Sequence, residues 1–146
     1  MIQIREMLLA DVEQVYAIEK SIFSIPWSKE SFERSIKGKD TLFIVAEKEG
    51  KISGYIGMYL LGEEADISNV AVAKEHRRQH IAHQMLEFIL IEAKKRGVCN
   101  VTLEVRETNV TAIRLSENIG FCEAGIRKNY YKEPIENALI MWKQNL

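Results

Sequence analysis

The sequence contains little that would tie it to a membrane, an oxidising compartment or a nucleic acid. Its 146 residues include two cysteines, Cys99 and Cys122, too few for a disulfide framework. We expect both to be small buried residues of a protein that works in a reducing compartment. No apolar run approaches the roughly 20 residues of a membrane-spanning helix, and residues 1–6 lack the apolar core of a signal peptide. The net charge of −1 gives no field that favours nucleic acid, so we predict a cytoplasmic protein that binds neither membranes nor nucleic acids.

Histidine is equally scarce, and its three copies are His76, His80 and His83. On one continuous helix these positions would share a face, and three imidazoles could bind zinc. We expect His76 in the turn before the helix, however, and the sequence offers no fourth ligand nearby. The sequence therefore predicts no metal site.

Hydrophobic residues make up 47% of the chain and charged residues 28%, which is the balance of a folded globular protein. The length suits one domain and is too short for two ordinary ones, so residues 1–146 are predicted to form a single domain. Strands are expected over residues 2–6, 41–47, 51–61, 67–72, 100–106, 121–128 and 138–142, and helices after Asp11, over 28–36, over 80–96, and from Asn109 or Thr111 to Gly120.

The connections between these elements indicate the fold class. The strands between residues 41 and 72 follow one another through short turns, which is typical of an antiparallel meander. The strand over 67–72 leads into a long helix and then into the strand over 100–106, which indicates a right-handed parallel crossover. The chain is therefore predicted to be an α/β domain of the α+β kind, with a mixed and mostly antiparallel sheet.

The segment from Ile67 to Gly97 carries the first functional signal. Its strand ends in a basic turn, residues 74–79, that opens the helix over 80–96. The first N–H groups of a helix have no partner inside it and lie at the positive end of the macrodipole, so a phosphate or pyrophosphate binds well there. This turn contains no glycine, although phosphate-binding turns usually have one.

Glu104 lies near the end of the next strand, inside the otherwise apolar run 101–105. Ligands of open α/β sheets bind at the carboxyl ends of such strands, so Glu104 and the basic turn are expected at the same edge. A carboxylate in partly apolar surroundings has a raised pKa and can act as a general base near neutral pH. The alternative is a solvated glutamate, or an ion-pair partner of Arg106.

Aromatic residues near turns are candidates for substrate binding. Trp27 follows Pro26 between two short helices, where it could line a cleft or simply pack. Tyr130 and Tyr131 end a strand beside basic residues, where paired rings could line a peptide groove or cover the core. The net charge disfavours a stacking platform for single-stranded nucleic acid.

Several short motifs occur in a fixed order along nearly the whole chain. They are Phe23-Ser24-Ile25-Pro26-Trp27-Ser28, Asn69-Val70-Ala71-Val72, Leu103-Glu104-Val105-Arg106 with Asn109 and Ala112, Asn118-Ile119-Gly120-Phe121, and Arg127 with Asn129-Tyr130-Tyr131. Any one alone is weak, but the ordered set resembles the GNAT acyltransferase superfamily. Within it, the set is most similar to the bacterial ribosomal-protein alanine N-acetyltransferases (RimI type).

The resemblance implies the GNAT fold, with helices on both faces of the sheet and the co-substrate acetyl-CoA between two splayed parallel strands. It implies direct transfer of the acetyl group, with Glu104 as general base and Ser116 at the position of the family's proton donor. Trp27, Tyr130 and Tyr131 would bind the substrate peptide. The residues implied in binding acetyl-CoA are Val70, Ala71, Val72, Arg77, Arg78, Gln79, His80, Ile81, Ala82 and Asn109.

Two positions depart from the family pattern. The pyrophosphate turn of the family has a glycine where this chain has His80, and glycine permits a close backbone approach to phosphate. The family places a tyrosine, which protonates the leaving thiolate, where this chain has Ser116. Loss of a general acid commonly lowers the rate by roughly 10² to 10⁴.

The predicted function is acetyl transfer from acetyl-CoA to the N-terminal alanine of a ribosomal protein, by resemblance the small-subunit protein eighteen. Two alternatives stay open. One is a binding or regulatory module that keeps the fold and has lost turnover, which His80 and Ser116 would explain. The other is an acetyltransferase for a small amine or another peptide.

Overall fold

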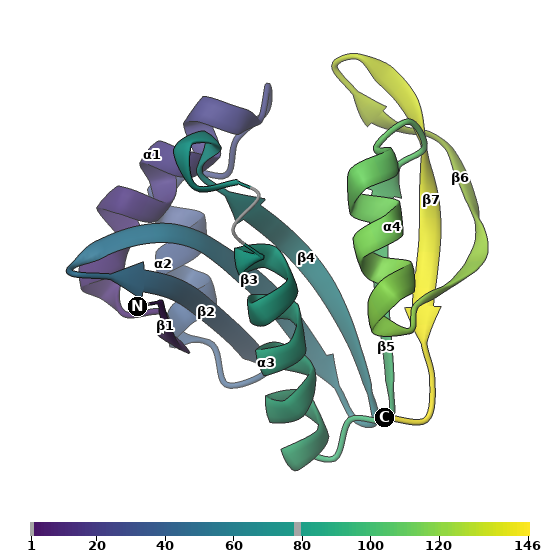
Figure 1. The fold of residues 1–146 in the computed structure, drawn as a ribbon, viewed down its shortest axis with the longest axis horizontal. Helices are drawn as coiled ribbons and strands as arrows, with labels where there is room; N and C mark the ends of the chain where they lie inside the picture. Colours follow the sequence, from purple (N-terminus) through teal and green to yellow (C-terminus); the bar gives the residue numbers. More distant parts are fainter. Residues whose placement is uncertain (1, 78–79) are drawn as a thin grey trace.

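A seven-stranded sheet in the order β1-β2-β3-β4-β5-β7-β6 forms the centre of the protein (Figure 1). The computed structural model describes residues 2–77 and 80–146. The strands are β1 (Gln3–Glu6), β2 (Thr41–Lys48), β3 (Lys51–Leu61), β4 (Glu64–Val72), β5 (Asn100–Arg106), β6 (Cys122–Lys132) and β7 (Ile135–Lys143). The helices are α1 (Val12–Ile22), α2 (Lys29–Lys37), α3 (Ile81–Lys95) and α4 (Val110–Ile119), with short 3-10 helices at Leu9–Asp11 and Lys74–His76. Apart from the 3-10 helices, this is the predicted order of elements.

The sheet is mixed and mostly antiparallel, as predicted. β4 and β5 are parallel, and the other neighbouring strands pair in antiparallel fashion. The chain passes from β4 to β5 through α3, which confirms the predicted crossover. β2, β3 and β4 form the predicted meander.

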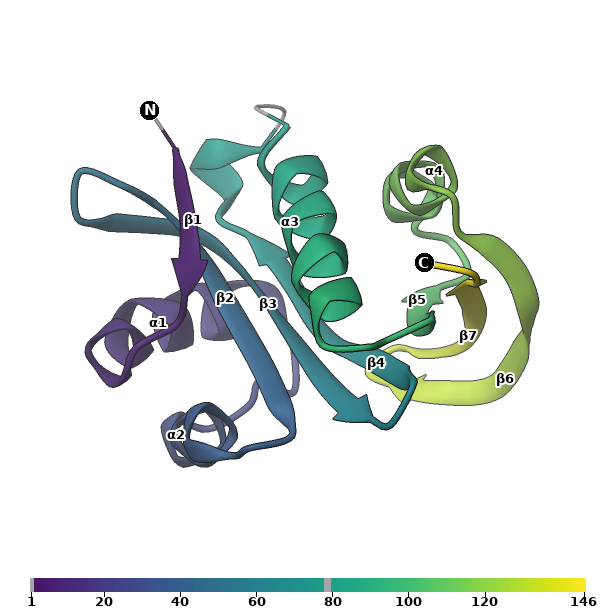
Figure 2. The ribbon, with the colours of Figure 1, turned by 90° about the horizontal axis from the view of Figure 1, so that it is seen from below.

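Helices cover both faces of the sheet, with α1 and α2 on one side and α3 and α4 on the other (Figure 2). The core under α3 and α4 is largely aliphatic and contains Ile44, Ile56, Ile81, Met85, Ile89, Leu103 and Met141. The core under α1 and α2 is more aromatic and contains Val15, Phe32, Phe43, Val45 and Tyr55. The two cores hold the central strands from both sides.

Two predicted helix starts are built as expected. The hydroxyl of Ser28 accepts a hydrogen bond from the N–H of Ser31 at 3.1 Å. The side-chain oxygen of Asn109 accepts one from the N–H of Ala112 at 3.2 Å. α4 ends at Gly120, whose φ of 109° is a left-handed conformation that glycine adopts without strain. These residues therefore set where α2 and α4 begin and where α4 stops.

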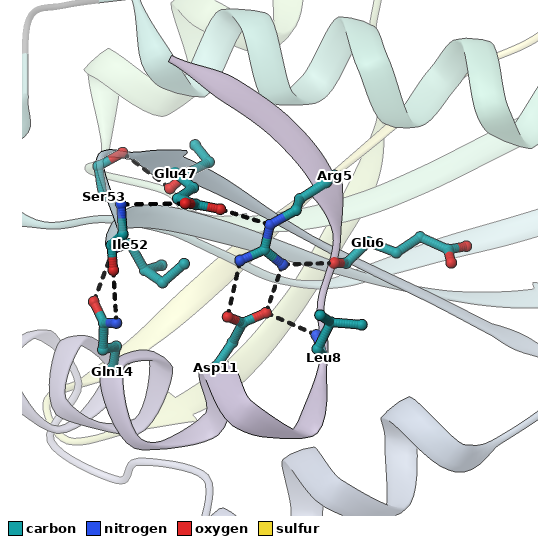
Figure 3. A network of polar contacts seen from close by, with 10 residues as sticks. Arg5, Glu6, Leu8, Asp11, Gln14, Glu47, Ile52 and Ser53 are labelled. Carbon is teal, nitrogen blue, oxygen red and sulfur yellow. Dashed lines mark hydrogen bonds and ion pairs between the residues drawn. The ribbon is translucent and has the colours of Figure 1, made fainter. Parts of the chain in front are cut away.

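Asp11, the predicted cap of α1, has a different partner. Its carboxylate binds the guanidinium of Arg5 in β1 through contacts of 2.8 and 3.0 Å and accepts the N–H of Leu8 at 2.7 Å (Figure 3). Arg5 also donates to Glu47 of β2 at 2.7 Å. We call these four residues the Arg5 network. It ties the start of α1 to the sheet edge instead of capping the helix, because Asp11 belongs to the 3-10 helix that precedes α1.

The C-terminal strands and the cysteines differ from the predictions. β6 runs on to Lys132 and β7 begins at Ile135, because antiparallel pairing continues up to the turn between them. Cys99 and Cys122 are exposed, not buried. Cys99 lies in the loop after α3, and Cys122 opens the edge strand β6, which has a neighbouring strand on one side. None of the described helices is long and apolar enough to cross a membrane.

Candidate active site

The two parallel strands separate halfway along the sheet. Pairing between β4 and β5 ends at Ile67 and Leu103. β4 continues to Val72 and β5 to Arg106, and Figure 1 shows the strands diverging toward these ends. Over the described part of β4 beyond Ile67, the edge that faces β5 has no strand partner. Its backbone N–H and C=O groups can therefore pair with another molecule.

A β-bulge lies where the strands separate. The pairing of β3 with β4 skips Ser68, which is the extra residue of the bulge. The extra residue shifts the alternation of side chains, so that Ile67 belongs to the core under α3 and Ala71 to the core under α1 and α2. Among the predicted cofactor residues, Val70 is exposed, Val72 is half-buried and Ala71 is buried. Ala71 can therefore offer its backbone, but its side chain is taken up by the core.

The basic turn joins the end of β4 to the N-terminus of α3, as predicted. Arg77 donates its Nε–H to the carbonyl of Val72 at 3.2 Å, which holds the turn against the strand end. α3 begins at Ile81, whose side chain is buried, and continues with the half-buried Ala82. The first N–H groups of α3 thus lie at the edge of the sheet where β4 ends.

His80 precedes α3 in a left-handed conformation, with φ 59° and ψ 22°. A residue with a Cβ is strained there by roughly 1–2 kcal/mol, whereas glycine is not. This backbone geometry gives a physical reason for a glycine at the position, and the chain keeps the geometry with an exposed imidazole. The predicted cofactor contacts of Arg78 and Gln79 lie outside the described residues.

Glu104 lies near the end of β5 with 16% of its side chain exposed. Its Oε2 is 2.8 Å from Nε of Arg127 on β6, so Arg127 and not Arg106 is its ion-pair partner. Burial raises the pKa of Glu104, and the negative charge of Asp66 on β4 raises it further, while Arg127 opposes both effects. A carboxyl with a raised pKa at this edge of the sheet has the properties of a general base.

Tyr130 and Tyr131 pack edge to face, with ring centroids 5.1 Å apart. Burial, together with the nearby charge of Glu104, raises the pKa of Tyr130, which is still 48% exposed. Burial raises the pKa of Tyr131 to about 12, and the Arg106 guanidinium lies 4.3 Å from its ring centroid. Tyr130 therefore lies close enough to Glu104 to feel its charge, and the ring of Tyr131 packs against the ring of Tyr130.

Trp27 packs in the aromatic core. Its ring centroid lies 5.2 Å from that of Phe32 and 6.0 Å from that of Phe43. It also lines a cavity of about 320 Å³ together with residues of α2, β2 and β3, including Tyr59. These contacts describe a packing residue at the rim of a cavity, and no described contact joins Trp27 to Glu104.

Ser116 is buried in α4, and its hydroxyl donates to the carbonyl of Ala112 at 2.9 Å. The O–H group is used inside the helix, so the described geometry does not present it to a leaving thiolate. The predicted role of Ser116 as proton donor therefore lacks geometric support. Asn109 lies at the predicted edge of the sheet, where its side-chain oxygen caps α4.

Glu19 of α1 is a buried carboxylate that the sequence analysis did not identify. It is 3% exposed and accepts the backbone N–H of Trp27 at 2.9 Å and the hydroxyl of Tyr55. Burial and this hydrogen bond raise the pKa of Tyr55. A glutamate on the same helical face as Val15, a buried residue, was the available signal. Glu19 holds the segment between α1 and α2 against the sheet.

The same segment touches the other half of the molecule. The hydroxyl of Ser24 donates to the carbonyl of Glu133, in the turn between β6 and β7, at 2.7 Å. The contact joins the segment that carries Trp27 to the strand pair that carries Tyr130. The structure thus links two of the regions predicted to bind substrate.

Comparison with known families agrees with this geometry. The family described as Acetyltransferase (GNAT) family matches residues 12–121. The chain belongs to this family. The predicted family and the predicted fold class are therefore confirmed.

Relatives of this GNAT acetyltransferase carry a more specific name. An Escherichia coli protein named ribosomal protein bS18-alanine N-acetyltransferase is 37% identical over 133 residues, which cover 90% of this chain and 89% of the relative. A Bacillus subtilis protein, whose name assigns it the same activity provisionally, is 36% identical over 140 residues, covering 95% of this chain and 93% of the relative.

Solved structures show the same fold. The crystal structure of the ribosomal-protein-S18-alanine N-acetyltransferase from Escherichia coli matches with a TM-score of 0.91 and 34% identity, over 99% of this chain and 94% of that one. The PaiA N-acetyltransferase of Thermoplasma acidophilum, solved in complex with coenzyme A, matches with a TM-score of 0.82 at 19% identity. At that identity the second match concerns the fold alone.

The histidines of this acetyltransferase do not gather on one helical face. His76 lies in a 3-10 helix, His80 lies before α3, and His83 pairs with Glu87 at 3.1 Å. Among residues 2–77 and 80–146, no three His, Cys, Asp or Glu side chains are grouped so that they could hold a metal ion.

Proposed function

We propose that this acetyltransferase moves the acetyl group of acetyl-CoA to the α-amino group of the N-terminal alanine of ribosomal protein bS18. The observation that carries the proposal is Glu104, a partly buried carboxyl of raised pKa on β5, next to the place where β4 and β5 part. The names of relatives at 36% and 37% identity support the choice of substrate. The proposal treats residues 1–146 as one catalytic domain, working in the cytoplasm on a ribosomal protein.

The residues around the diverging strands suit acetyl-CoA. The unpaired edge of β4 at Val70, Ala71 and Val72 can pair with the amide groups of the pantetheine arm, as another strand would. The N-terminus of α3 suits the pyrophosphate, because its first N–H groups and the helix dipole attract an anion. The predicted cradle from Arg77 to Ala82, with Arg78, Gln79, His80 and Ile81, belongs to this proposal, as does Asn109 at the start of α4.

The chemistry then follows from Glu104. An N-terminal ammonium has a pKa of about 8, so a base of moderate strength removes its proton near neutral pH. The neutral amine attacks the thioester carbonyl, and backbone N–H groups near Val70 can stabilise the oxyanion. The C–S bond breaks as the amide forms, and the nitrogen gives up its second proton to water or to the departing thiolate. Because a thiol has a pKa of about 8.5, the sulfur can leave largely as thiolate, and a proton from Ser116 is not required.

A CoA-release assay with a peptide that begins with the bS18 alanine tests the proposal. We expect one acetyl group per peptide, placed on the α-amine by fragment mass spectrometry. The same peptide with a blocked amino terminus is the control and should not react. Acetylation of a lysine side chain alone would contradict the proposed substrate. If acetyl-CoA bound in calorimetry but no peptide reacted, the chain would be a binding module.

A further inference from the structure

Helices cover about half of one face of the sheet, and the other half is open. α1 and α2 lie over the half formed by β2, β3 and β4, whereas Figure 2 shows no described helix on that side of β5, β7 and β6. α4 lies on the opposite side of these three strands. The mechanism proposed above uses this open face at Glu104, near the end of β5.

The strand registers arrange side chains in rows that begin beside α2, where the hydroxyls of Tyr59 and Ser35 are hydrogen-bonded, and continue across the open face. Residues directly opposite each other on neighbouring strands point to the same side of a sheet. One row contains Thr41, Tyr59, Asp66, Thr102, Trp142 and Cys122, from β2, β3, β4, β5, β7 and β6 in turn. The next row contains Leu61, Glu64 and Asn100.

These rows combine large exposed apolar groups with carboxylates. Trp142 is 41% exposed, Tyr59 39% and Leu61 80%. Glu64 and Asp66 are exposed between them, and the hydroxyl of Thr102 donates to Asp66 at 2.9 Å. None of the positions in the two rows is a lysine or an arginine. We call the set Tyr59, Leu61, Glu64, Asp66, Thr102 and Trp142 the docking face.

The docking face is continuous with the catalytic carboxylate. Thr102 and Glu104 lie two residues apart on β5, so both side chains point to the same side. The strand register sets Ile140 beside Glu104 and Trp142 beside Thr102. A chain whose amino terminus reaches Glu104 therefore needs few further residues to lie over the docking face.

We propose that the docking face binds the body of the substrate protein through a cationic segment with apolar side chains, beyond the residues held at Glu104. The inference rests on the proposed function. A protein that binds ribosomal RNA neutralises phosphates with lysine and arginine, and such a surface is complementary to Glu64 and Asp66. Trp142 and Leu61 supply the apolar contacts. Arg34 lines the cavity beside Tyr59, so a positive charge lies next to this end of the docking face.

The test compares a complete substrate with a short one. A dipeptide that begins with alanine spans about 7 Å when extended, no more than the separation of Glu104 and Thr102 on β5, and so occupies the catalytic end only. Complete bS18 would also contact the docking face. For Trp142→Ala and Glu64→Lys we expect a KM for complete bS18 raised roughly tenfold, with kcat unchanged. The KM for the short peptide should stay at the value of the unchanged chain.

Two control variants match these changes on the opposite side of the sheet. Ile91→Ala removes an exposed apolar side chain from α3, and Glu117→Lys reverses an exposed charge on α4. Neither should alter the KM of either substrate, and thermal unfolding of every variant confirms that it is folded. If Trp142→Ala and Glu64→Lys raised the KM equally for the short peptide and for complete bS18, or left the KM for complete bS18 unchanged, the proposed role of the docking face would be wrong.

The other outcomes separate the two proposals. If the unchanged chain acetylates the short peptide but gains nothing from complete bS18, the docking face is wrong and the proposed function stands. If it acetylates neither, the proposed function fails and the docking face fails with it. A dimer in sedimentation that Trp142→Ala dissociates would assign the face to a second copy and would also overturn the inference.

Discussion

Two arginine–carboxylate pairs in this protein have the same N–O distance, but the pKa values of their carboxyls shift in opposite directions. Arg5 lies 2.8 Å from Asp11, and Arg127 lies 2.8 Å from Glu104. Burial alone would raise the pKa of Asp11, but hydrogen bonds from Arg5 and a backbone N–H lower it. The pKa of Glu104 is raised, because burial and a neighbouring carboxylate outweigh Arg127.

The number of donors around each carboxyl explains the difference. Asp11 accepts two hydrogen bonds from Arg5 and one from Leu8, and the Arg5 side chain is 27% exposed. Glu104 has one described partner, Arg127, whose side chain is 57% exposed and so more fully hydrated. The first carboxyl is held ionised and stabilises the fold. The second keeps an affinity for protons, which is what a base needs.

The largest effect is expected at the second pair. Glu104→Gln removes the proposed base, because an amide cannot take up the proton of the attacking ammonium. We expect kcat/KM for an alanine-starting peptide to fall by roughly 10² to 10⁴ in the CoA-release assay. Binding of acetyl-CoA in calorimetry should be unchanged. Glu123→Gln, at an exposed glutamate of β6, is the matched control, and an equal loss there would refute the assignment.

At the first pair, stability and not activity should respond. Arg5→Ala leaves the buried carboxyl of Asp11 without its charged partner, so we expect the free energy of unfolding to fall by about 2–3 kcal/mol. Urea denaturation at neutral pH measures it. Arg127→Ala is the comparison and should lower stability less, because Arg127 is largely hydrated. Equal losses for the two arginines would break the contrast between the pairs.

The two carboxyls also make stability depend on pH in opposite directions. The folded-state pKa of Asp11 is below its ordinary 3.8, so its contribution is complete above 3.8 and is lost as the pH falls through the lower value. The folded-state pKa of Glu104 is above 4.5, so stability falls as the pH rises from 4.5 through the higher value.

Variants separate these two pH effects. Asp11→Asn should flatten the loss of stability on the acid side, and Glu104→Gln should remove the loss above 4.5. Thermal unfolding measured from about pH 2 to pH 8 checks both. If Asp11→Asn lost stability more steeply than the unchanged chain as the pH falls, the lowered pKa of Asp11 would be contradicted.

A substitution at Asp66 should shift the pKa of Glu104 downward, in the direction in which the pKa of Asp11 is shifted. Asp66→Asn removes a negative charge that raises the pKa of Glu104, so that pKa should fall. Activity that requires ionised Glu104 should then persist to lower pH. The measurement is the acid limb of kcat/KM against pH, with the short alanine-starting peptide. A limb that moves to higher pH would show that Glu104 is not the group that titrates.

The smallest effect is expected at Ser116. Because its hydroxyl is bonded to the carbonyl of Ala112, we expect Ser116→Ala to change kcat by less than about threefold, well below the loss of a general acid. A loss as large as that of Glu104→Gln would restore Ser116 as the proton donor.

Much of the fold could be predicted from short stretches of sequence. Alternation and turn residues gave the bounds of β3 and β5, and the order of elements gave the parallel pair. The caps Ser28 and Asn109 bond to residues three positions on, so their geometry is local. The site at the ends of β4 and β5 followed from the same local signals, together with the resemblance to the family.

Other features depend on the register between distant strands, which local patterns do not encode. The bulge at Ser68, the pairing of Glu104 with Arg127 and the approach of Asp66 all depend on which residues of β3, β4, β5 and β6 come together. The buried hydroxyl of Ser116 and the exposed Cys122 likewise follow from what lies on either side of each element. Sequence identified the carboxylate, and the tertiary structure decided in which direction its pKa shifts, because a pKa depends on burial and on neighbouring charges.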